Sequence, residues 1–373
     1  MRTASQHILF LATEYDAPGM HPYAVNIINS LWQAGDHVII VTRHGAENEA
    51  FPDIPDNDIT WIDYPAAKLQ RAMFRYFPKR LNRAIDRVLD TCDIGLIYSL
   101  TGELVLAPSI RRLQARVPVL YTVHDAVYHD YKFNSPVAWL KDRLIIALPQ
   151  QRLFNHTLNK VTNSHEQLDY ITRHYPGHRV SYVPFPSLVN AAITNGERQV
   201  DELKGVGDGY ILFFGTVQFY KGVHVLTEAY RTHPELQSRP LVIAGKGDFR
   251  FDGPVNGLDV IHINRFIDDS ELRDLFTRAG VVVYPYISAT QSGVTSIAAY
   301  FGRPMVLSDL PFFTHTCSRA AGVEFFPSGD SDALAASVCR VLASSATTTA
   351  LYDRLYSPEA LRDGLEKAIS KLL

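Results

Sequence analysis

The sequence is poor in cysteine. Cys92, Cys317 and Cys339 are the only cysteines in 373 residues. An odd number of widely separated cysteines forms neither a disulfide framework nor the closely spaced ligand pairs of a zinc site. We therefore expect neither disulfide bonds nor a bound metal.

Long apolar runs and an excess of one charge are also missing. No segment approaches the roughly 20 apolar residues of a membrane-spanning helix, and the first apolar stretch is too short for a signal peptide. Lys and Arg number 36 against 39 Asp and Glu, a net charge of −3, which does not favour nucleic acid as a partner. These absences predict a cytoplasmic protein.

The chain does have the length and the hydrophobic content, 46%, to build two domains. Short apolar segments alternate with helical patterns in both halves, which predicts an α/β protein with two doubly wound parallel sheets. We expect a first domain over 1–190, a linker over 191–209, a second domain over 210–345 and C-terminal helices over 346–373. The strands predicted in the first half are 8–12, 38–42, 94–98, 119–123, 160–162 and 180–183.

A polar segment follows an apolar strand in YPYISATQSGVTSIAAYFGRP, residues 284–304. Free backbone N–H groups and the helix dipole attract anions at a helix start, and Gly293 would let a ligand approach the main chain. An ordinary helix cap is the alternative. The candidate binding residues here are Thr290, Gln291, Ser292, Gly293 and Val294.

A second loop of the same design precedes it by about seventy residues. A strand over 210–214 ends at Gly215, and Lys221 with Gly222 opens the next helix. A lysine at a helix start is a point charge suited to a diphosphate, although a solvated surface lysine is the usual alternative. Two such loops in one parallel-sheet half favour one shared anionic ligand over two coincidences.

With these segments, most of the chain resembles the retaining nucleotide-sugar glycosyltransferases of the GT-B fold, glycosyltransferase family 4. The resemblance implies a second domain that holds the nucleotide sugar, a first domain that holds the acceptor, and an active site in the cleft between them. It also implies that the last helix, around 358–373, crosses back to the first domain. The motifs that carry it are FFGTVQFYKGVHVLTEAY, LVIAGKGD, VIHINRFIDDSELRDLFTRAGVVVYPY, GRPMVLSDLPFF, HILFLATEYDAPGMHPYAVNIINSLWQAGDHVIIVT and VPVLYTVHDAVYHD.

The chain departs from the family pattern at several places. Thr216 and Gln218 stand where family members usually carry an arginine that shares the diphosphate charge. Ala289 and Ile297 stand where the usual pair of glutamates aligns. The chain resembles a subgroup with a TQSG motif instead of those glutamates, although it has Ser288 where that subgroup commonly has a glutamate.

The resemblance also assigns roles outside the two anion loops. His124, after the strand over 119–123, would face the donor sugar and the leaving phosphate, whereas a hydrogen-bonded interior histidine is the alternative. Gly19 would lie in the loop over the donor phosphates or the acceptor, and Phe266 near the nucleobase. Ser164 looks like the family's strand-to-helix serine, or a plain N-cap with Gln167 beyond it.

Residues 68–87 carry seven basic side chains against one acid, Asp86. Interleaved apolar residues make the segment amphipathic, and Pro78 should break or bend it. It could lie on an anionic membrane or collect a negatively charged acceptor such as a lipid diphosphate. The solvated face of a surface helix is the alternative. The residues that we assign to binding the acceptor or the membrane surface are Arg71, Arg75, Lys79 and Arg80.

The function implied is retaining transfer of a hexose-like sugar from a UDP- or GDP-sugar to a glycan, lipid-linked or small-molecule acceptor. His124 and Lys221 are the catalytic candidates, and Lys221 with the amides near Ser292 and Gly293 would stabilise the leaving diphosphate without a metal or cofactor. Cell-envelope polysaccharide synthesis at the inner face of the cytoplasmic membrane fits this reading. The alternatives are a catalytically silent nucleotide-sugar-binding or scaffold protein, a nucleotide-sugar epimerase or hydrolase, and a nucleotide-binding protein that shares only the architecture.

Overall fold

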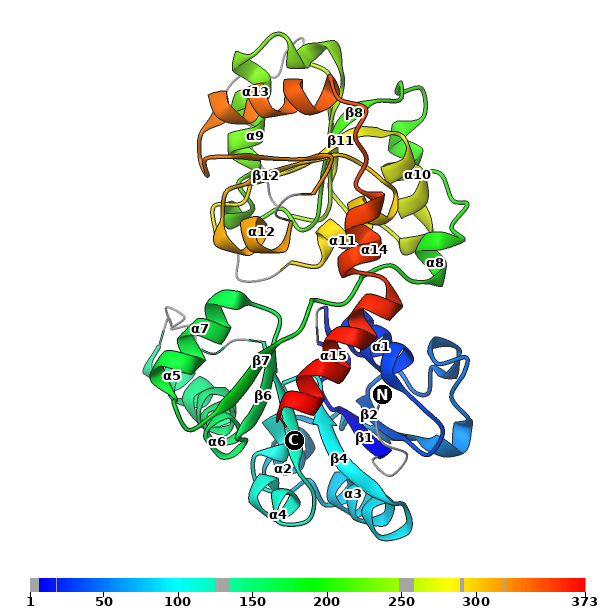
Figure 1. The fold of residues 1–373 in the computed structure, drawn as a ribbon, viewed down its shortest axis with the longest axis vertical. Helices are drawn as coiled ribbons and strands as arrows, with labels where there is room; N and C mark the ends of the chain where they lie inside the picture. Colours follow the sequence, from blue (N-terminus) through cyan, green and yellow to red (C-terminus); the bar gives the residue numbers. More distant parts are fainter. Residues whose placement is uncertain are drawn as a thin grey trace. The chain divides into compact units, whose positions relative to one another are not determined.

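The computed structural model describes residues 7–17, 19–102, 104–124, 126, 135–247, 258–288, 292–317 and 320–372. Two compact units make up the chain (Figure 1). The first unit comprises Met1–Pro186 and Pro358–Leu373, and the second comprises Ser187–Ser357.

The first unit is built on a seven-stranded parallel sheet of order β3-β2-β1-β4-β5-β6-β7. Helices follow the strands and cover both faces, so the central strands are buried on both sides. The strands are β1 (His7–Ala12), β2 (His37–Thr42), β3 (Ile59–Asp63), β4 (Ile94–Ser99), β5 (Val119–Val123), β6 (Asn159–Thr162) and β7 (Arg179–Tyr182). The helices are α1 (Met20–Leu31), α2 (Lys68–Tyr76), α3 (Lys79–Thr91), α4 (Ile110–Gln114), α5 (Pro136–Asp142), α6 (Leu148–His156), α7 (His165–His174) and α15 (Pro358–Leu372).

The second unit repeats the design with a six-stranded parallel sheet of order β10-β9-β8-β11-β12-β13. The strands are β8 (Tyr210–Phe214), β9 (Leu241–Ala244), β10 (Val260–Ile263), β11 (Ala279–Tyr284), β12 (Met305–Ser308) and β13 (Val323–Phe326). The helices are α8 (Ala191–Thr194), α9 (Val223–Thr232), α10 (Leu272–Thr277), α11 (Val294–Tyr300), α12 (Pro311–Thr316), α13 (Ser331–Leu342) and α14 (Thr349–Leu355). The prediction of two doubly wound parallel sheets is confirmed.

Two strands carry no clear signal in the sequence, β3 and β13. Each lies at the edge of its sheet, where one side of the strand has no neighbour and fewer side chains are buried. β3 includes Thr60 and Asp63, and β13 includes Glu324, so neither reads as the continuous apolar run of a central parallel strand.

The division between the units falls a few residues from the predicted linker. Residues 191–209 contain α8 and the 3-10 turn η5 (Asp201–Leu203), and Ile193, Val200 and Leu203 are buried in the core of the second unit. The final helix α15 packs against α1 in the first unit (Figure 1). There Leu365 is buried, and Arg362 Nε donates to the carbonyl of Ser30 at 2.7 Å.

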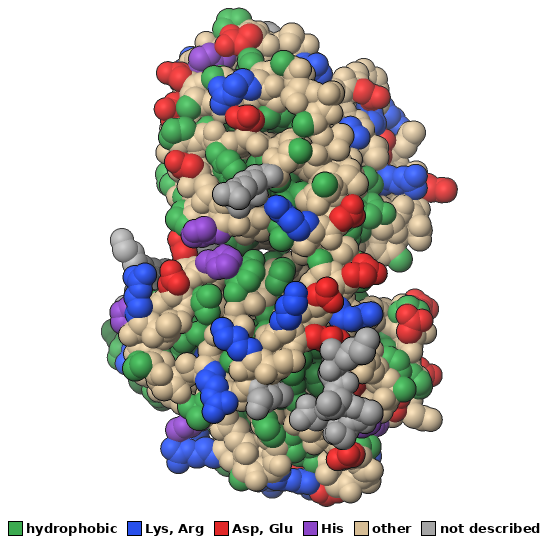
Figure 2. Space-filling model, in the orientation of Figure 1, with side chains coloured by type: hydrophobic (Ala, Val, Ile, Leu, Met, Phe, Trp, Pro, Cys, Tyr) green, Lys and Arg blue, Asp and Glu red, His purple; other side chains and the backbone are tan. Residues whose placement is uncertain are grey.

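Charge is mixed on the surface. In the part of the face that Figure 2 draws in colour, Lys and Arg side chains are interspersed with Asp and Glu on both units. Within the described ranges, none of the helices combines the length and the apolar character needed to cross a membrane.

A fully buried lysine lies in the first unit. Lys160, in β6, has no exposed surface; its Nζ donates to the carbonyl of Thr157 and lies 4.5 Å from the centre of the Phe154 ring. Burial penalises the charged form and lowers the pKa of Lys160 to about 7.

This burial predicts a pH-dependent stability. Between pH 7 and the unfolded pKa near 10.4, the unfolded chain binds more protons at Lys160 than the folded chain, so the free energy of unfolding rises with pH. We expect the rise between pH 7 and 9, at most about 1.4 kcal/mol per pH unit, to be lost in Lys160→Met. The exposed Lys367→Met in the same unit should keep it. Chemical denaturation at three pH values measures the slopes, and equal slopes for Lys160→Met and the parent would contradict the account.

Candidate functional site

The strand order of the second sheet places two loops side by side. β8 and β11 are neighbours at the centre of the sheet, where the order of the strands reverses. In open α/β sheets, ligands bind at this point, beyond the carboxyl ends of the strands. The loop that holds Lys221 follows β8, and the loop that leads to Ser292 follows β11. Ile287 N donates to the carbonyl of Tyr220 at 2.8 Å, which ties the two loops together.

Tyr286 joins the two candidate loops chemically. Lys221 Nζ donates to the Tyr286 hydroxyl at 2.7 Å and lies 3.9 Å from the centre of its ring. The same hydroxyl lies 3.4 Å from Ser292 Oγ. Lys221 and Ser292 therefore belong to one hydrogen-bonded group, with Tyr286 between them. We call these three residues the Lys221 group.

The electrostatics of the group favour an anion. Burial lowers the pKa of Lys221 to about 8 and raises the pKa of Tyr286 well above its ordinary value, so the phenol stays neutral. Among the residues that the structure describes, no carboxylate forms an ion pair with Lys221. A largely buried cation without a counter-charge is costly, and an anionic ligand would supply the missing charge.

Glycines allow the loops to meet this closely. Gly222 has a φ of +67°, and a Cβ built on it would lie 1.7 Å from the carbonyl oxygen of Pro285. Gly245, after β9, packs in the same way on Gly215, whose carbonyl oxygen would lie 2.0 Å from an added Cβ. The backbones after β8, β9 and β11 are therefore in contact, and Lys221 is held against the β11 loop.

The remaining predicted residues of the second unit are placed as follows. Thr290 and Gln291 lie outside the described residues. Gly293 is the N-cap of α11, and no side chain caps this helix start. The Val294 carbonyl accepts a hydrogen bond from Tyr284 Oη at 3.2 Å. Phe266 follows the edge strand β10, two strands from β8, and is 78% exposed.

In the first unit, His124 lies at the carboxyl end of β5. Its Nε2 is 2.8 Å from the carbonyl of Leu100, so this nitrogen carries the proton and donates. The ring packs edge-on against Tyr23, with centroids 4.9 Å apart. Gln167 Nε2 donates to the His124 carbonyl, and Ser164 caps α7 through Gln167 N at 3.4 Å. His124 is thus fixed directly after β5, at the edge formed by the carboxyl ends of the strands, and its contact with a donor stays a prediction.

Gly19 also lies at this edge. It is the N-cap of α1 with a φ of +79°, and an added Cβ would meet no atom within 4 Å. The glycine is therefore required by its left-handed backbone and not by crowding, and the surrounding space is open.

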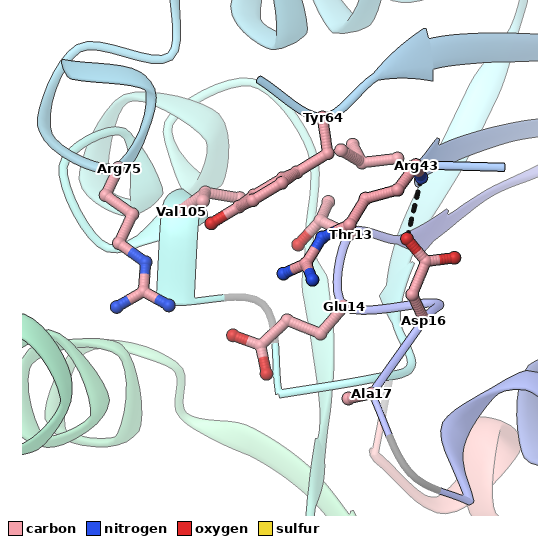
Figure 3. A pocket seen from close by; sticks show the side chains of 9 residues that line it. Thr13, Glu14, Asp16, Ala17, Arg43, Tyr64, Arg75 and Val105 are labelled. Carbon is pink, nitrogen blue, oxygen red and sulfur yellow. Dashed lines mark hydrogen bonds between the residues drawn. The ribbon is translucent and has the colours of Figure 1, made fainter. Parts of the chain in front are cut away.

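A cavity of about 280 Å³ opens beyond β1, β2 and β3 (Figure 3). Arg43 lies with its guanidinium carbon 4.9 Å from the centre of the Tyr64 ring, and Asp16 fixes the loop by accepting from Arg43 N at 2.7 Å. Glu14 and Arg75 also line the cavity. Of these five residues, only Arg75 is among the site residues predicted from the sequence. The other four follow the ends of β1, β2 and β3. Their position shortly after a parallel strand is the sequence signal that could have identified them as candidate site residues.

The basic segment forms two helices, as the sequence predicts. α2 ends at Tyr76, Pro78 is the N-cap of α3, and α3 begins at Lys79. Lys79 and Arg80 are exposed, whereas Arg71 and Arg75 are partly buried. Within the described residues, no cluster of three or more His, Cys, Asp or Glu side chains could hold a metal ion.

Each unit contains a match to a known protein family. Residues 18–186 match the family described as glycosyl transferase 4-like domain, and residues 208–344 match glycosyl transferases group 1. Both units are glycosyltransferase domains. The group 1 domain therefore carries the Lys221 group, and the 4-like domain carries His124, Gly19 and the cavity of Figure 3.

Two curated proteins are similar to part of these domains. One is the O-antigen chain mannosyltransferase C of Escherichia coli, 28% identical over 134 residues, which are 34% of this chain and 35% of the relative. The other is the D-rhamnosyltransferase WbpZ of Pseudomonas aeruginosa, 26% identical over 111 residues, or 28% of each chain. The chain thus spans about a third of the length of the curated relatives it matches.

Solved structures share the fold of the two glycosyltransferase domains over nearly the whole chain. Anabaena HepE in complex with UDP and glucose has a TM-score of 0.65 at 15% identity, covering 98% of this chain and 99% of the other. A glycosyltransferase from Rickettsia africae has a TM-score of 0.67 at 14% identity, covering 99% of both chains. These likenesses establish the GT-B fold.

The glycine at the start of α9 gives a stability test of the loop packing. In Gly222→Ala, the positive φ and the contact with the Pro285 carbonyl should destabilise the second unit by about 2 kcal/mol or more. Gly207→Ala is the matched control, because an added Cβ there meets nothing within 4 Å. Thermal unfolding followed by circular dichroism measures both variants. A Gly222→Ala midpoint equal to that of Gly207→Ala would contradict the packing described.

Proposed function

We propose that the protein is a retaining glycosyltransferase that moves a hexose-like sugar from a nucleoside diphosphate sugar to an acceptor bound by the first unit. The observation that carries the proposal is the Lys221 group, in which a largely buried lysine at the switch point of the second sheet has no carboxylate partner among the described residues. A diphosphate has the charge and the size to occupy such a place.

The donor is a UDP- or GDP-sugar. UDP is supported by the structural likeness to HepE, which is known in complex with UDP and with UDP-glucose. A hexose-like sugar is supported by the curated relatives, which are named as transferring mannose and D-rhamnose. The name of the first relative, an O-antigen chain mannosyltransferase, also supports a place in cell-envelope polysaccharide synthesis. For this role we place the protein in the cytoplasm or at the inner face of the cytoplasmic membrane.

In the proposed mechanism the protein stabilises charge on the leaving diphosphate. Lys221 supplies the positive charge, and the Ser292 hydroxyl and the amides near Gly293 supply hydrogen-bond donors. No metal or cofactor is needed for this role. The acceptor hydroxyl attacks the anomeric carbon from the face that the diphosphate leaves, which retains the configuration. The diphosphate departs with the bonding electron pair, and its oxygen takes up the proton that the hydroxyl loses.

Three further residues complete the proposed site. His124 orients the donor sugar, Gly19 leaves space for the donor phosphates or the acceptor, and the exposed ring of Phe266 lies beside the nucleobase. Their contacts with the donor stay predictions.

A donor-binding protein without turnover is the second candidate. Ile297, which stands where one family glutamate aligns, is 2% exposed in the core of the second unit, so a donor contact cannot come from that position. Thr216, where the arginine is missing, is exposed. Binding without release of nucleoside diphosphate would favour this candidate.

Lys221→Met tests the donor site. The variant removes the charge but keeps an unbranched apolar side chain, so the fold should persist. We expect the Kd for the preferred nucleotide among UDP, GDP and dTDP to rise at least about tenfold, the loss of one charge-assisted hydrogen bond. Calorimetric titration measures the Kd, and release of nucleoside diphosphate from the matching sugar donor measures turnover.

Lys204→Met is the control for this variant. Lys204 precedes β8 and is 67% exposed, so nucleotide binding should not change. An unchanged Kd in Lys221→Met would remove the lysine from the site.

The pKa of Lys221 predicts a pH dependence of binding. Lys221 is charged below pH 8 and loses its proton above it, whereas the diphosphate keeps its charge. Affinity should therefore fall by up to about tenfold per pH unit above pH 8. Titrations at pH 7, 8 and 9 measure the slope. Lys221→Met should bind weakly at each pH without this slope, and a parent protein with constant affinity would contradict the assignment.

A further inference from the structure

Two neighbouring cavities of the first unit share Arg75. One is the charged cavity of about 280 Å³ in Figure 3. The other encloses about 170 Å³, and Arg75 lines it too. Arg75 therefore stands where the two cavities meet, on the last turn of α2.

The charged cavity is suited to a sugar next to an anionic group. Figure 3 shows Arg75, Arg43 and Glu14 reaching into it from different elements, with the Tyr64 ring between the two arginines. The Glu14 carboxylate can accept hydrogen bonds from sugar hydroxyls, and the two guanidinium groups can donate to phosphate oxygens. An aromatic ring beside them offers an apolar face for a sugar ring.

The second cavity is mainly apolar. Apart from Arg75 and Arg152, its lining includes Tyr76, Leu104, Ala107, Pro108, Leu144 and Leu148. Two hydrogen bonds fix α2 to the turn η4 (Arg143–Ala147) beside it: Tyr76 Oη to Leu144 O at 2.9 Å and Arg75 Nη1 to Ile145 O at 3.4 Å. Its apolar wall is thus formed by three segments far apart in the sequence, around residues 76, 104–108 and 144–149.

Three large side chains that line this cavity also reach the surface: Tyr76 is 43% exposed, Leu144 45% and Leu148 44%. Other large apolar residues of the same unit are exposed as well. On α2, Leu69 is 75% exposed and Met73 57%. On α5, Trp139 is 47% exposed and Leu140 50%. Exposed large apolar residues are typical of a surface that binds something apolar, and the basic residues of α2 and α3 favour an anionic partner.

We propose that the two cavities bind one amphiphilic acceptor, a sugar carried on a phosphate or diphosphate with a hydrocarbon chain. Arg75 binds the phosphate, the chain lies in the apolar cavity and leaves it past the exposed side chains of Leu144 and Leu148, and the sugar lies in the charged cavity beside Glu14. This inference rests on the proposed transferase function and selects a lipid-linked acceptor over a free glycan. A free anion would leave the apolar cavity unused, and a neutral lipid would bring no negative charge to Arg75.

Direct binding to the full-length protein tests the proposal. The probes are farnesyl diphosphate, farnesol and inorganic diphosphate, measured by equilibrium dialysis at concentrations below micelle formation. We expect farnesyl diphosphate to bind at least about tenfold more tightly than either of the other two, because only it occupies both cavities.

Two variants and two matched controls assign the binding to these cavities. Arg75→Gln and Leu148→Asn should each weaken farnesyl diphosphate binding at least about fivefold. Arg173→Gln, 77% exposed on α7, and Leu158→Asn, 51% exposed before β6, should leave it unchanged. Leu148 is 44% exposed, so the fold should tolerate the change, and thermal unfolding checks this.

Several outcomes would overturn the proposal. If inorganic diphosphate binds as tightly as farnesyl diphosphate, the cavities bind an anion only and the hydrocarbon chain contributes nothing. Equal binding of farnesol, with no effect of Arg75→Gln, would leave only an apolar surface. No binding of farnesyl diphosphate, or equal losses in the control variants, would also reject it.

The nucleotide titrations keep this inference separate from the proposed function. If nucleotides bind through Lys221 and farnesyl diphosphate does not bind, the proposed transferase function is supported and the lipid-linked acceptor is rejected. If farnesyl diphosphate binds through Arg75 and no nucleotide binds, the amphiphile site is supported and the donor site is rejected.

Discussion

The proposed chemistry of this protein depends on a lysine that is largely buried against a tyrosine ring. Lys221 Nζ has a hydrogen bond to Tyr286 and a contact with its ring, but no carboxylate partner among the described residues. Burial makes the charge costly, and this cost lowers the pKa of the side chain to about 8. An incoming diphosphate would relieve the cost, so the free energy of binding and the protonation of Lys221 are coupled.

The fold brings this lysine to the right place by topology. In the second sheet, the strand order reverses between β8 and β11, so the loops that follow these strands lie next to each other. Gly222 permits a backbone approach to the Pro285 carbonyl that a Cβ would block. The first sheet has the same plan, and its charged cavity lies beyond β1, β2 and β3. In both units the proposed site lies at the carboxyl ends of parallel strands.

The sequence predicted the parts of the structure that leave a local pattern. Central strands are continuous apolar runs, and Gly215, Lys221 and Ser292 follow such runs, so their positions could be anticipated. Tyr286 could not be assigned, because its role depends on the register of two loops that are distant in the chain. Arg43, Tyr64 and Glu14 follow three separate strands, one of them the weakly apolar edge strand β3. Only the strand order shows that these residues line one cavity.

The most direct test of this account is the number of protons taken up when the preferred nucleoside diphosphate binds. Calorimetry at pH 8.5 in buffers of different ionisation enthalpy measures it. Because the bound diphosphate should raise the pKa of Lys221, the protein should take up roughly half a proton or more at this pH. The uptake should vanish in Lys221→Met. Binding without proton uptake, or with equal uptake in the variant, would show that the diphosphate does not contact Lys221.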